Sequence, residues 1–358
     1  MLWVDKHRPK ALEKLDYHDN LSKRLKAIAG TGDLPHLLFY GPSGAGKKTR
    51  VMALLREMFG PGVEKVKLEH RTFKTPSRRT IELTTLGSNY HIEMNPSDAG
   101  NNDRYVVQEV IKEIAQFHPV VSGMAEGAGK GKNVTFKVVF LSDCDRLTKA
   151  AQHGLRRTME KYVKSCRLIL CCENLSKVID PLRSRCLPIR VSAPSREEIC
   201  SILMTVSEKE RAPLSQEAAA RITDASKRNL RRALLMAEAQ RVRNDPNAEV
   251  PVPDWESFIA GIVSKIEREQ SPKMLLEVRK DLYHVLGNCI PPSVVFQTLV
   301  YYLVKRMDAS LAHDVFSAAA DYEHRMHLGQ KDVYHIEAFV AQVMLLYKKY
   351  IADLVNLC

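Results

Sequence analysis

A glycine-rich segment with the spacing of a phosphate-binding loop lies near the amino terminus. The segment GPSGAGKKT, residues 41–49, follows a short apolar run and precedes a helical pattern. In this setting glycines let backbone N–H groups approach phosphates, and a lysine reaches the β and γ positions. The amino terminus of the following helix adds a dipole that favours an anion. The segment predicts a nucleotide site whose binding residues are Gly41, Gly44, Ala45, Gly46, Lys47, Lys48 and Thr49.

The position that normally binds Mg²⁺ departs from this pattern. The residue after the loop lysine is usually Ser or Thr, whose hydroxyl is a metal ligand. Here it is Lys48, an ammonium donor that cannot ligate a metal, and Thr49 comes one residue late on the helix. We therefore expect Mg²⁺ to be bound weakly or not at all, and we predict no metal-ligating residue.

A second segment resembles the acidic half of an ATPase site in degenerate form. The apolar run Phe136–Leu141 is followed by Ser142 and Asp143, where a metal-binding Asp and a water-polarising Glu are expected. Ser142 could hold Mg²⁺ only weakly or through water. Asp143 is one methylene shorter than Glu, so it is a weak catalytic candidate. The sequence therefore predicts that this site binds a nucleotide and hydrolyses it poorly.

An arginine precedes the last apolar run of this region. Arg185 lies in the segment PLRSRC, residues 181–186. An exposed arginine there can stabilise charge on a γ-phosphate, and a finger supplied in trans is worth about 10³–10⁵ in rate. Most such arginines, considered in isolation, are surface residues in salt bridges.

Strand and helix patterns alternate up to about residue 192. We expect strands at 34–40, 90–94, 136–141, 167–172 and 187–191, and helices at Lys47–Phe59 and Ala150–Tyr162. This alternation predicts an α/β domain with a parallel sheet over residues 1–192. Helices at Arg196–Glu208, Gln216–Ala225 and Leu230–Arg243 predict a helical lid over 193–245. A proline-rich linker and further helices predict an all-α domain over 246–358.

Composition limits the function classes. The chain has 358 residues, of which 45% are hydrophobic and 27% charged, with a net charge of +12. The excess of positive charge suits a polyanionic partner as well as it suits an ordinary basic protein. The amino terminus contains no apolar signal-type run, and no segment has the length of a membrane span, so we expect an intracellular protein. The eight cysteines lack metal-site spacing and are expected to be reduced and mostly buried.

Several motifs together carry a family resemblance over essentially the whole chain. They are LWVDKHRP, LPHLLFYGPSGAGKKT, NPSDAGNNDR, LRRTMEKY, SRC, NLRRALLMAEA, NCIPP and YEHRMHLGQKDVYHIEAF. In this order the sequence resembles the replication factor C small subunits, which are AAA+ clamp loaders, and within them the subunit 3/5 type. The resemblance implies an AAA+ P-loop domain, a helical lid and an all-α collar domain.

The resemblance also implies roles for individual residues. Val4, Arg8 and Pro9 match a segment that lies against adenine, and residues 44–49 match the triphosphate loop. Arg231 matches a lid arginine that contacts the γ-phosphate, so the expected ligand is ATP or ADP. Arg185 matches an arginine finger that acts in a neighbouring subunit's site. Glu173 stands where the family has Asn, and its charge would repel a γ-phosphate.

The family forms a ring of five subunits around duplex DNA and opens a sliding clamp. The implied partners are four other replication factor C subunits, a clamp of the proliferating cell nuclear antigen type and primer-template DNA, in the nucleus and without a membrane. The candidate contacts to DNA phosphates are Arg104, Lys149, Arg156 and Arg157. For Arg156 and Arg157, ion pairs within or between subunits are an equally good interpretation.

Three functions remain open from the sequence. The favoured one is a clamp-loader subunit that binds nucleotide, hydrolyses it poorly and completes a neighbour's site with Arg185. The second is an active ATPase subunit, which Lys48, Ser142 and Glu173 disfavour. The third is a scaffold with a purely structural nucleotide, which the intact SRC segment disfavours.

Overall fold

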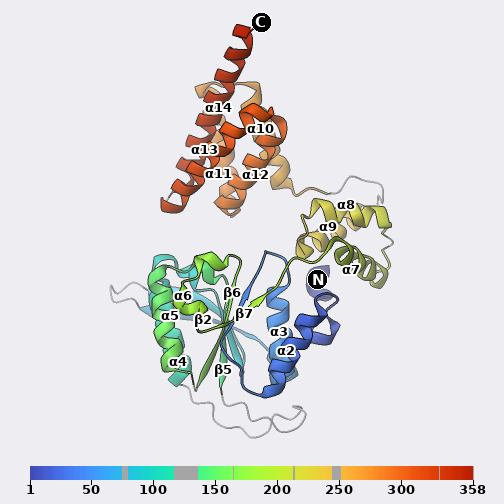
Figure 1. Ribbon diagram of the computed structural model, residues 1–358, viewed down its shortest axis with the longest axis vertical. Coiled ribbons are helices and arrows are strands. Elements are labelled where there is room, and N and C mark those ends of the chain that lie inside the picture. The colour runs from blue at the N-terminus through green and yellow to red at the C-terminus, as the bar shows by residue number, and fades with distance from the viewer. Residues whose placement is uncertain are drawn as a thin grey trace. The chain divides into compact units, whose positions relative to one another are not determined.

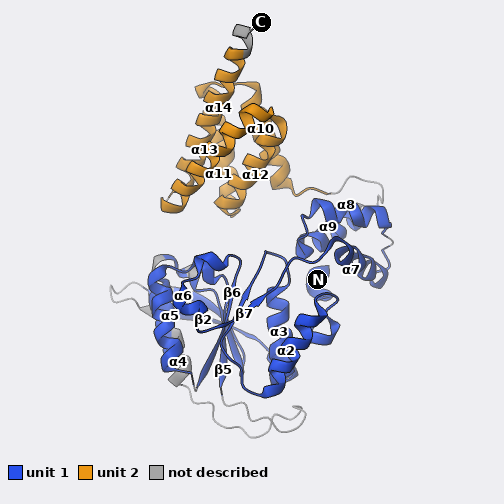
Figure 2. Cartoon of the chain, in the orientation of Figure 1, with its two compact units in different colours: residues 1–250 blue, residues 251–358 orange. Residues whose placement is uncertain are grey.

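The computed structural model describes residues 1–74, 80–116, 136–163, 165–212, 214–243, 251–329 and 331–357 (Figure 1). The chain divides into two compact units, Met1–Val250 and Pro251–Cys358 (Figure 2). The predicted boundary between residues 245 and 246 lies outside the described residues. The predicted separation of 1–192 from 193–245, both within the first unit, stays a prediction.

A seven-stranded sheet in the order β2-β3-β4-β5-β6-β1-β7 forms the centre of the first unit. Five of its strands are parallel: β1 (Leu37–Tyr40), β4 (His91–Met94), β5 (Lys137–Leu141), β6 (Cys166–Cys172) and β7 (Leu187–Arg190). Strands β1, β5 and β6 are almost wholly buried, as expected for runs of Val, Leu, Ile and Phe covered by helices on both faces. The predicted parallel sheet is confirmed for these five strands.

An antiparallel hairpin, not predicted from the sequence, extends the sheet beyond β4. It consists of β2 (Lys67–Lys74) and β3 (Thr80–Gly87), which pair along their whole length. The sequence of β2, KLEHRTFK, is rich in charged residues and does not alternate regularly between apolar and polar types, so its pattern gave no strand signal.

Helices cover the two faces of the sheet and position its loops. The first unit contains α1 (Trp3–Lys6), α2 (Asp19–Thr31), α3 (Lys47–Phe59), α4 (Asp103–Gln116), α5 (Lys149–Lys161), α6 (Asp180–Arg183), α7 (Arg196–Lys209), α8 (Gln216–Ala225) and α9 (Leu230–Arg243). Helices α4 and α5 lie on one side of the sheet, and α2 and α3 on the other (Figure 1). Short 3₁₀ turns occur at Leu12–Lys14, Pro61–Glu64, Pro96–Asn102, Cys144–Arg146 and Leu175–Lys177.

Helices α7, α8 and α9 form a small bundle with its own apolar cluster. Ile199, Leu203 and Ile222 are buried in it, and Trp3 from the amino terminus packs into the same cluster. Ser195 forms a capping box with Glu198 at the start of α7. The packing of Trp3 attaches the amino-terminal segment to this bundle as well as to the sheet region.

The second unit is helical throughout its described residues. It contains α10 (Asp254–Arg268), α11 (Pro272–Gly287), α12 (Pro292–Arg306), α13 (Ala309–Leu328) and α14 (Asp332–Leu357). Ser271 caps the amino terminus of α11, since its hydroxyl accepts from the Met274 N–H at 3.2 Å. None of the helices in the described part of the chain has both the length and the apolar composition to span a bilayer.

The cysteines of the sheet region are buried, as predicted. Burial raises the pKa of Cys166, Cys171, Cys172 and Cys186 to about 12, whereas Cys289 is exposed. At pH 8 we expect iodoacetamide to modify Cys289 about 10³ times faster than these four, because the thiolate is the reactive form. Peptide mass spectrometry of the native chain measures the five rates. Equal labelling of Cys171 and Cys289 would contradict the burial.

Candidate functional site

The predicted phosphate-binding loop connects β1 to α3 and requires glycine at three positions. Gly44 and Gly46 have φ values of 73° and 81°, in the left-handed region that favours glycine. A Cβ on Gly44 would lie 1.8 Å from Asn229 Oδ1, and one on Gly46 would lie 2.3 Å from the Tyr17 hydroxyl. At Gly41 a Cβ would lie 1.9 Å from a backbone oxygen. The loop is therefore packed closely against Tyr17, against the backbone that follows β7 and against Asn229, the residue that precedes α9.

Two residues that were not predicted from the sequence, Tyr17 and Arg50, hold the loop in place through hydrogen bonds. The Tyr17 hydroxyl donates to the Ala45 carbonyl oxygen at 2.9 Å. Arg50 in α3 is fully buried, donates through Nη2 to the Tyr17 carbonyl oxygen at 2.7 Å and lies 4.8 Å from the centre of the Tyr17 ring. A charged residue on the apolar side of a predicted helix, next to Val51 and Leu54, is the signal that could have identified Arg50.

The two lysines of the loop make different contacts. Lys47 Nζ donates to the carbonyl oxygens of Gly41 at 2.6 Å and Pro42 at 2.9 Å, so its ammonium lies over the loop. Lys48 Nζ forms an ion pair with the carboxylate of Glu93 in β4. The Thr49 hydroxyl accepts from Arg8 Nε at 3.2 Å, which joins the amino-terminal segment to α3.

A cavity of about 260 Å³ brings most of the predicted binding residues together. The predicted residues that line it are Val4, Arg8, Pro9, Gly44, Ala45, Gly46, Lys47, Lys48, Thr49, Asp143 and Arg231. Gly41 begins the loop but is not among the lining residues, and neither is Arg185. Apolar lid residues that the sequence analysis did not name, Ile202, Val206 and Leu234, form another part of the wall.

The chemistry of this lining fits a nucleotide. One part consists of loop glycines, lysines and a helix amino terminus, which suit phosphates. Another consists of aliphatic side chains from the lid with Val4 and Pro9, which suit an uncharged aromatic base. The lining does not fit a metal of the usual kind, because Lys48 holds the position of the hydroxyl ligand.

The end of β5 offers little for catalysis. The Ser142 hydroxyl donates to the Met94 carbonyl oxygen at 3.2 Å, so it is engaged with the neighbouring strand. Asp143 has a φ of 50°, unusual for a residue other than glycine, and lines the cavity together with Glu173. Asp145 accepts from the backbone N–H groups of Glu173 and Asn174 at 3.3 and 3.2 Å. Among the described residues, no group of three His, Cys, Asp or Glu side chains could hold a metal.

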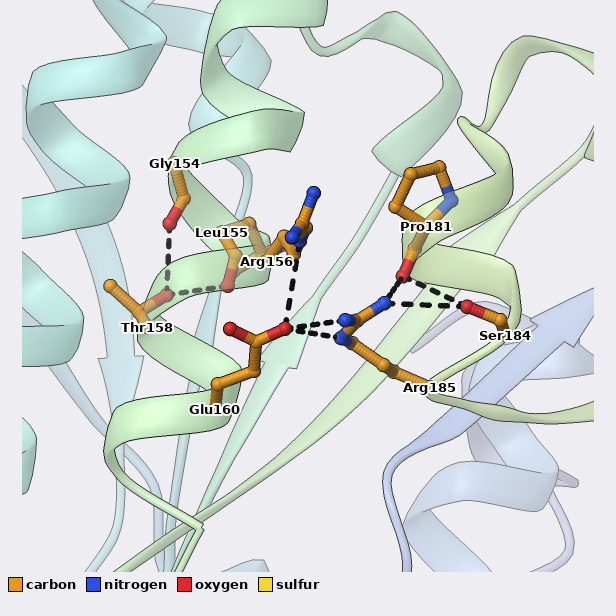
Figure 3. Close-up of polar contacts among 8 residues, drawn as sticks. All are labelled: Gly154, Leu155, Arg156, Thr158, Glu160, Pro181, Ser184 and Arg185. Carbon is orange, nitrogen blue, oxygen red and sulfur yellow. Dashed lines mark hydrogen bonds and ion pairs between the residues drawn. The ribbon is translucent and has the colours of Figure 1, made fainter.

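Arg185 follows α6 and contacts α5 (Figure 3). Its Nε donates to Glu160 Oε1 at 2.7 Å, and its Nη2 lies 2.5 Å from the same oxygen. Its Nη1 donates to the Pro181 carbonyl oxygen at 2.8 Å and to the Ser184 hydroxyl at 3.4 Å. The Arg185 hydrogen bond holds the pKa of Glu160 below its usual value. The side chain of Arg185 is 33% exposed.

Three of the four predicted DNA-contacting residues converge. Arg104 of α4 and Arg156 and Arg157 of α5 line one surface pocket of about 460 Å³. Lys149, the first residue of α5, is not among its lining residues. Arg156 Nε also lies 3.5 Å from Glu160 Oε1, as the ion-pair interpretation predicted for this residue.

Comparison with known proteins places the chain in a family. A model described as the C-terminal domain of replication factor C subunit 3 matches residues 255–351. A protein named replication factor C subunit 3 from Mus musculus is 52% identical over 355 residues, which cover 98% of each chain. The chain belongs to the replication factor C family. The subunit 3 of Homo sapiens, with 98% of each chain covered, and the subunit 5 of Oryza sativa, with 99% of each covered, are both 51% identical.

Two further models match the first unit of this replication factor C chain. A lid domain of the RCF1/5-like AAA+ ATPases matches residues 201–242, and the DNA polymerase III delta subunit model matches residues 17–195. Together with the sheet and the helical second unit, they confirm the predicted AAA+ fold class, which implies nucleotide binding. Among solved structures, the Holliday junction branch migration motor RuvB of Thermotoga maritima has a TM-score of 0.48 and 17% identity, covering 77% of this chain and 85% of that chain.

Proposed function

We propose that this chain is a clamp-loader subunit that binds ATP or ADP, hydrolyses it poorly and supplies Arg185 to a neighbouring subunit. The observation that carries this proposal is the ion pair of Lys48 with Glu93 beside an otherwise complete phosphate loop. Lys47 and the loop N–H groups would hold the phosphates, while Val4, Arg8 and Pro9 would lie against the base. Arg231, on the lid side of the same cavity, would contact the terminal phosphate.

Poor hydrolysis follows from the groups around the terminal phosphate. Mg²⁺ normally bridges the β and γ phosphates and neutralises the developing charge. In this cavity the side-chain ammonium group of Lys48 stands in place of the hydroxyl ligand. The hydroxyl of Ser142 donates to the Met94 carbonyl oxygen in β4. The carboxylate of Glu173 adds a negative charge that opposes the charge of the phosphate. Asp143 is left as a weak candidate for polarising water.

The proposed partners follow from family membership and charge. Four other replication factor C subunits, a clamp of the proliferating cell nuclear antigen type and primer-template DNA would assemble with this chain in the nucleus. The cluster of Arg104, Arg156 and Arg157 supports a sequence-independent contact with DNA phosphates, to which Lys149 would contribute from the first residue of α5. DNA repair would use the same loading reaction.

The test compares two variants of this chain in the reconstituted five-subunit complex. We expect Arg185→Ala to abolish most clamp- and DNA-stimulated ATP hydrolysis at the neighbouring site, and Lys47→Ala to have little effect once assembly is confirmed. If Lys47→Ala costs as much turnover as Arg185→Ala while the complex stays intact, this chain hydrolyses its own ATP and the proposal is wrong.

Nucleotide binding to this chain is expected to be nearly independent of magnesium. Removal of Mg²⁺ with EDTA should change the Kd for ADP by about threefold or less, because Lys48 stands where the hydroxyl ligand of the metal would be. The Lys48→Thr variant restores a hydroxyl ligand and should become sensitive to EDTA. Isothermal titration of both chains with and without EDTA measures the difference. A tenfold loss of affinity in the natural chain would show that a metal is bound after all.

A further inference from the structure

The guanidinium of Arg185 is largely engaged within its own chain. All three of its nitrogens donate, and the edge formed by Nε and Nη2 is taken by one oxygen of Glu160 (Figure 3). Nη1 is directed to Pro181 and Ser184. Arginine recognises a phosphate best with two parallel N–H groups, and the Nε–Nη2 edge is one of the two edges that offer such a pair. A phosphate that uses this edge must displace Glu160.

The charge of Glu160 interacts unfavourably with the dipole of its own helix. It is the penultimate residue of α5, near the carboxyl end, where the helix dipole disfavours a carboxylate. Two guanidinium groups compensate for this, Arg185 at 2.5 and 2.7 Å and Arg156 at 3.5 Å, all measured to Oε1. The arginine contacts, rather than capping, therefore account for an acidic residue at this point.

The backbone that carries Arg185 is fixed on both sides. Leu182 and Cys186 are 1% and 7% exposed, so the segment is anchored in the apolar core on either side of the arginine. The backbone N–H of Arg185 donates to the Leu182 carbonyl oxygen at 3.1 Å. Engagement of a ligand by Arg185 therefore requires rotation of its side chain, which the contact with Glu160 opposes.

We infer that Glu160 is a positioning residue that restrains Arg185 against its own subunit until a neighbouring subunit's phosphate displaces it. This inference rests on the proposed function, because it assumes that Arg185 acts in trans. The carboxylate of Glu160 and the terminal phosphate are both oxyanions that compete for one guanidinium. The restraint lowers the fraction of time that Arg185 is available, and it acts most strongly when the ring is not yet closed on clamp and DNA.

The test uses the Glu160→Gln variant in the reconstituted five-subunit complex. An exposed ion pair gives a modest restraint, so we expect ATP hydrolysis without clamp and DNA to rise about two- to fivefold. The rate with both clamp and DNA should stay unchanged, so the ratio of stimulated to basal rates falls by the same factor. A structural role of Glu160 would instead lower both rates. A fall in the basal rate, or no change in it, overturns the inference.

Two controls separate this inference from the proposed function. Glu13, an exposed carboxylate paired with Lys26, provides a matched Glu13→Gln variant that should leave both rates unchanged. The double variant Glu160→Gln/Arg185→Ala should behave as Arg185→Ala alone, because without the arginine side chain Glu160 has nothing to restrain. If Arg185→Ala itself has no effect, the proposed function fails. If it impairs hydrolysis while Glu160→Gln does not raise the basal rate, only the role of Glu160 fails.

Discussion

Replacement of Arg185 by alanine is expected to slow ATP hydrolysis at the neighbouring subunit's site by about 10³–10⁵-fold, the value of an arginine finger supplied in trans. The expectation follows from the placement of Arg185. It lies outside this chain's own cavity, its side chain is partly exposed, and its backbone is held between buried residues. The measurement is single-turnover hydrolysis in complexes where the neighbour keeps the only intact loop lysine.

Arg183 supplies a matched control from the same segment. It is two residues away, its side chain is 41% exposed, and it pairs with Asp180 of its own helix at 3.1 Å. Arg183→Ala removes the same charge and is expected to leave the neighbour's rate within about twofold, as for an ordinary surface ion pair. Equal losses in the two variants would mean that general positive charge, and not a directed guanidinium, drives the neighbour's reaction.

Replacement of Arg50 by alanine is expected to lower the free energy of unfolding of the first unit by about 3 kcal/mol. The change leaves a cavity in a fully buried region and removes the donor to the Tyr17 carbonyl oxygen. Urea unfolding followed by Trp3 fluorescence, in a Trp255→Phe background, measures the loss for this unit. Because Tyr17 holds the Ala45 carbonyl oxygen, the Kd for nucleotide should rise in the same variant.

Arg56 is the comparison on the same helix. It lies in α3, pairs with Glu64 at 2.6 Å and has a side chain that is 35% exposed. Arg56→Ala is expected to cost about 0.5 kcal/mol or less, since exposed ion pairs contribute little. A loss for Arg50→Ala as small as that for Arg56→Ala would show that burial of the guanidinium costs as much as its contacts contribute.

Features that depend on local sequence were predicted well. Helices α3, α8 and α9 begin and end at the predicted residues, because each combines an apolar periodicity with clear end signals such as Gly60 or the Ser215 cap. The phosphate loop was identified for the same reason, since its glycines and lysine lie within nine residues. The hairpin β2–β3 was missed because the sequence of β2 is rich in charged residues and does not alternate clearly between apolar and polar types, although Leu83 of β3 is buried in the core.

Contacts between residues far apart in the chain could not be predicted. Lys48 was recognised as a misfit, yet nothing in the sequence indicates that Glu93, 45 residues away, is its partner. The same holds for Arg185 and Glu160, 25 residues apart. Such pairs are set by which strands are neighbours in the sheet and how helices pack across it. The residue types were sufficient to predict the chemistry, but the residues that pair with Lys48 and Arg185 are determined by the fold.

The two outer strands of the sheet bear on whether copies of this chain self-associate. Strand β2 forms one edge and carries Lys67 and Arg71, and charged side chains on an edge strand discourage pairing with another chain. At the other edge, β7 contains Pro188. The Leu187 N–H donates to the His36 carbonyl oxygen, on the side of the neighbouring strand β1. The nitrogen of Pro188, which lacks a hydrogen, therefore faces the unpaired side of β7. Both edges are therefore poor templates for amyloid-like strand addition in a subunit that has not yet assembled with other subunits.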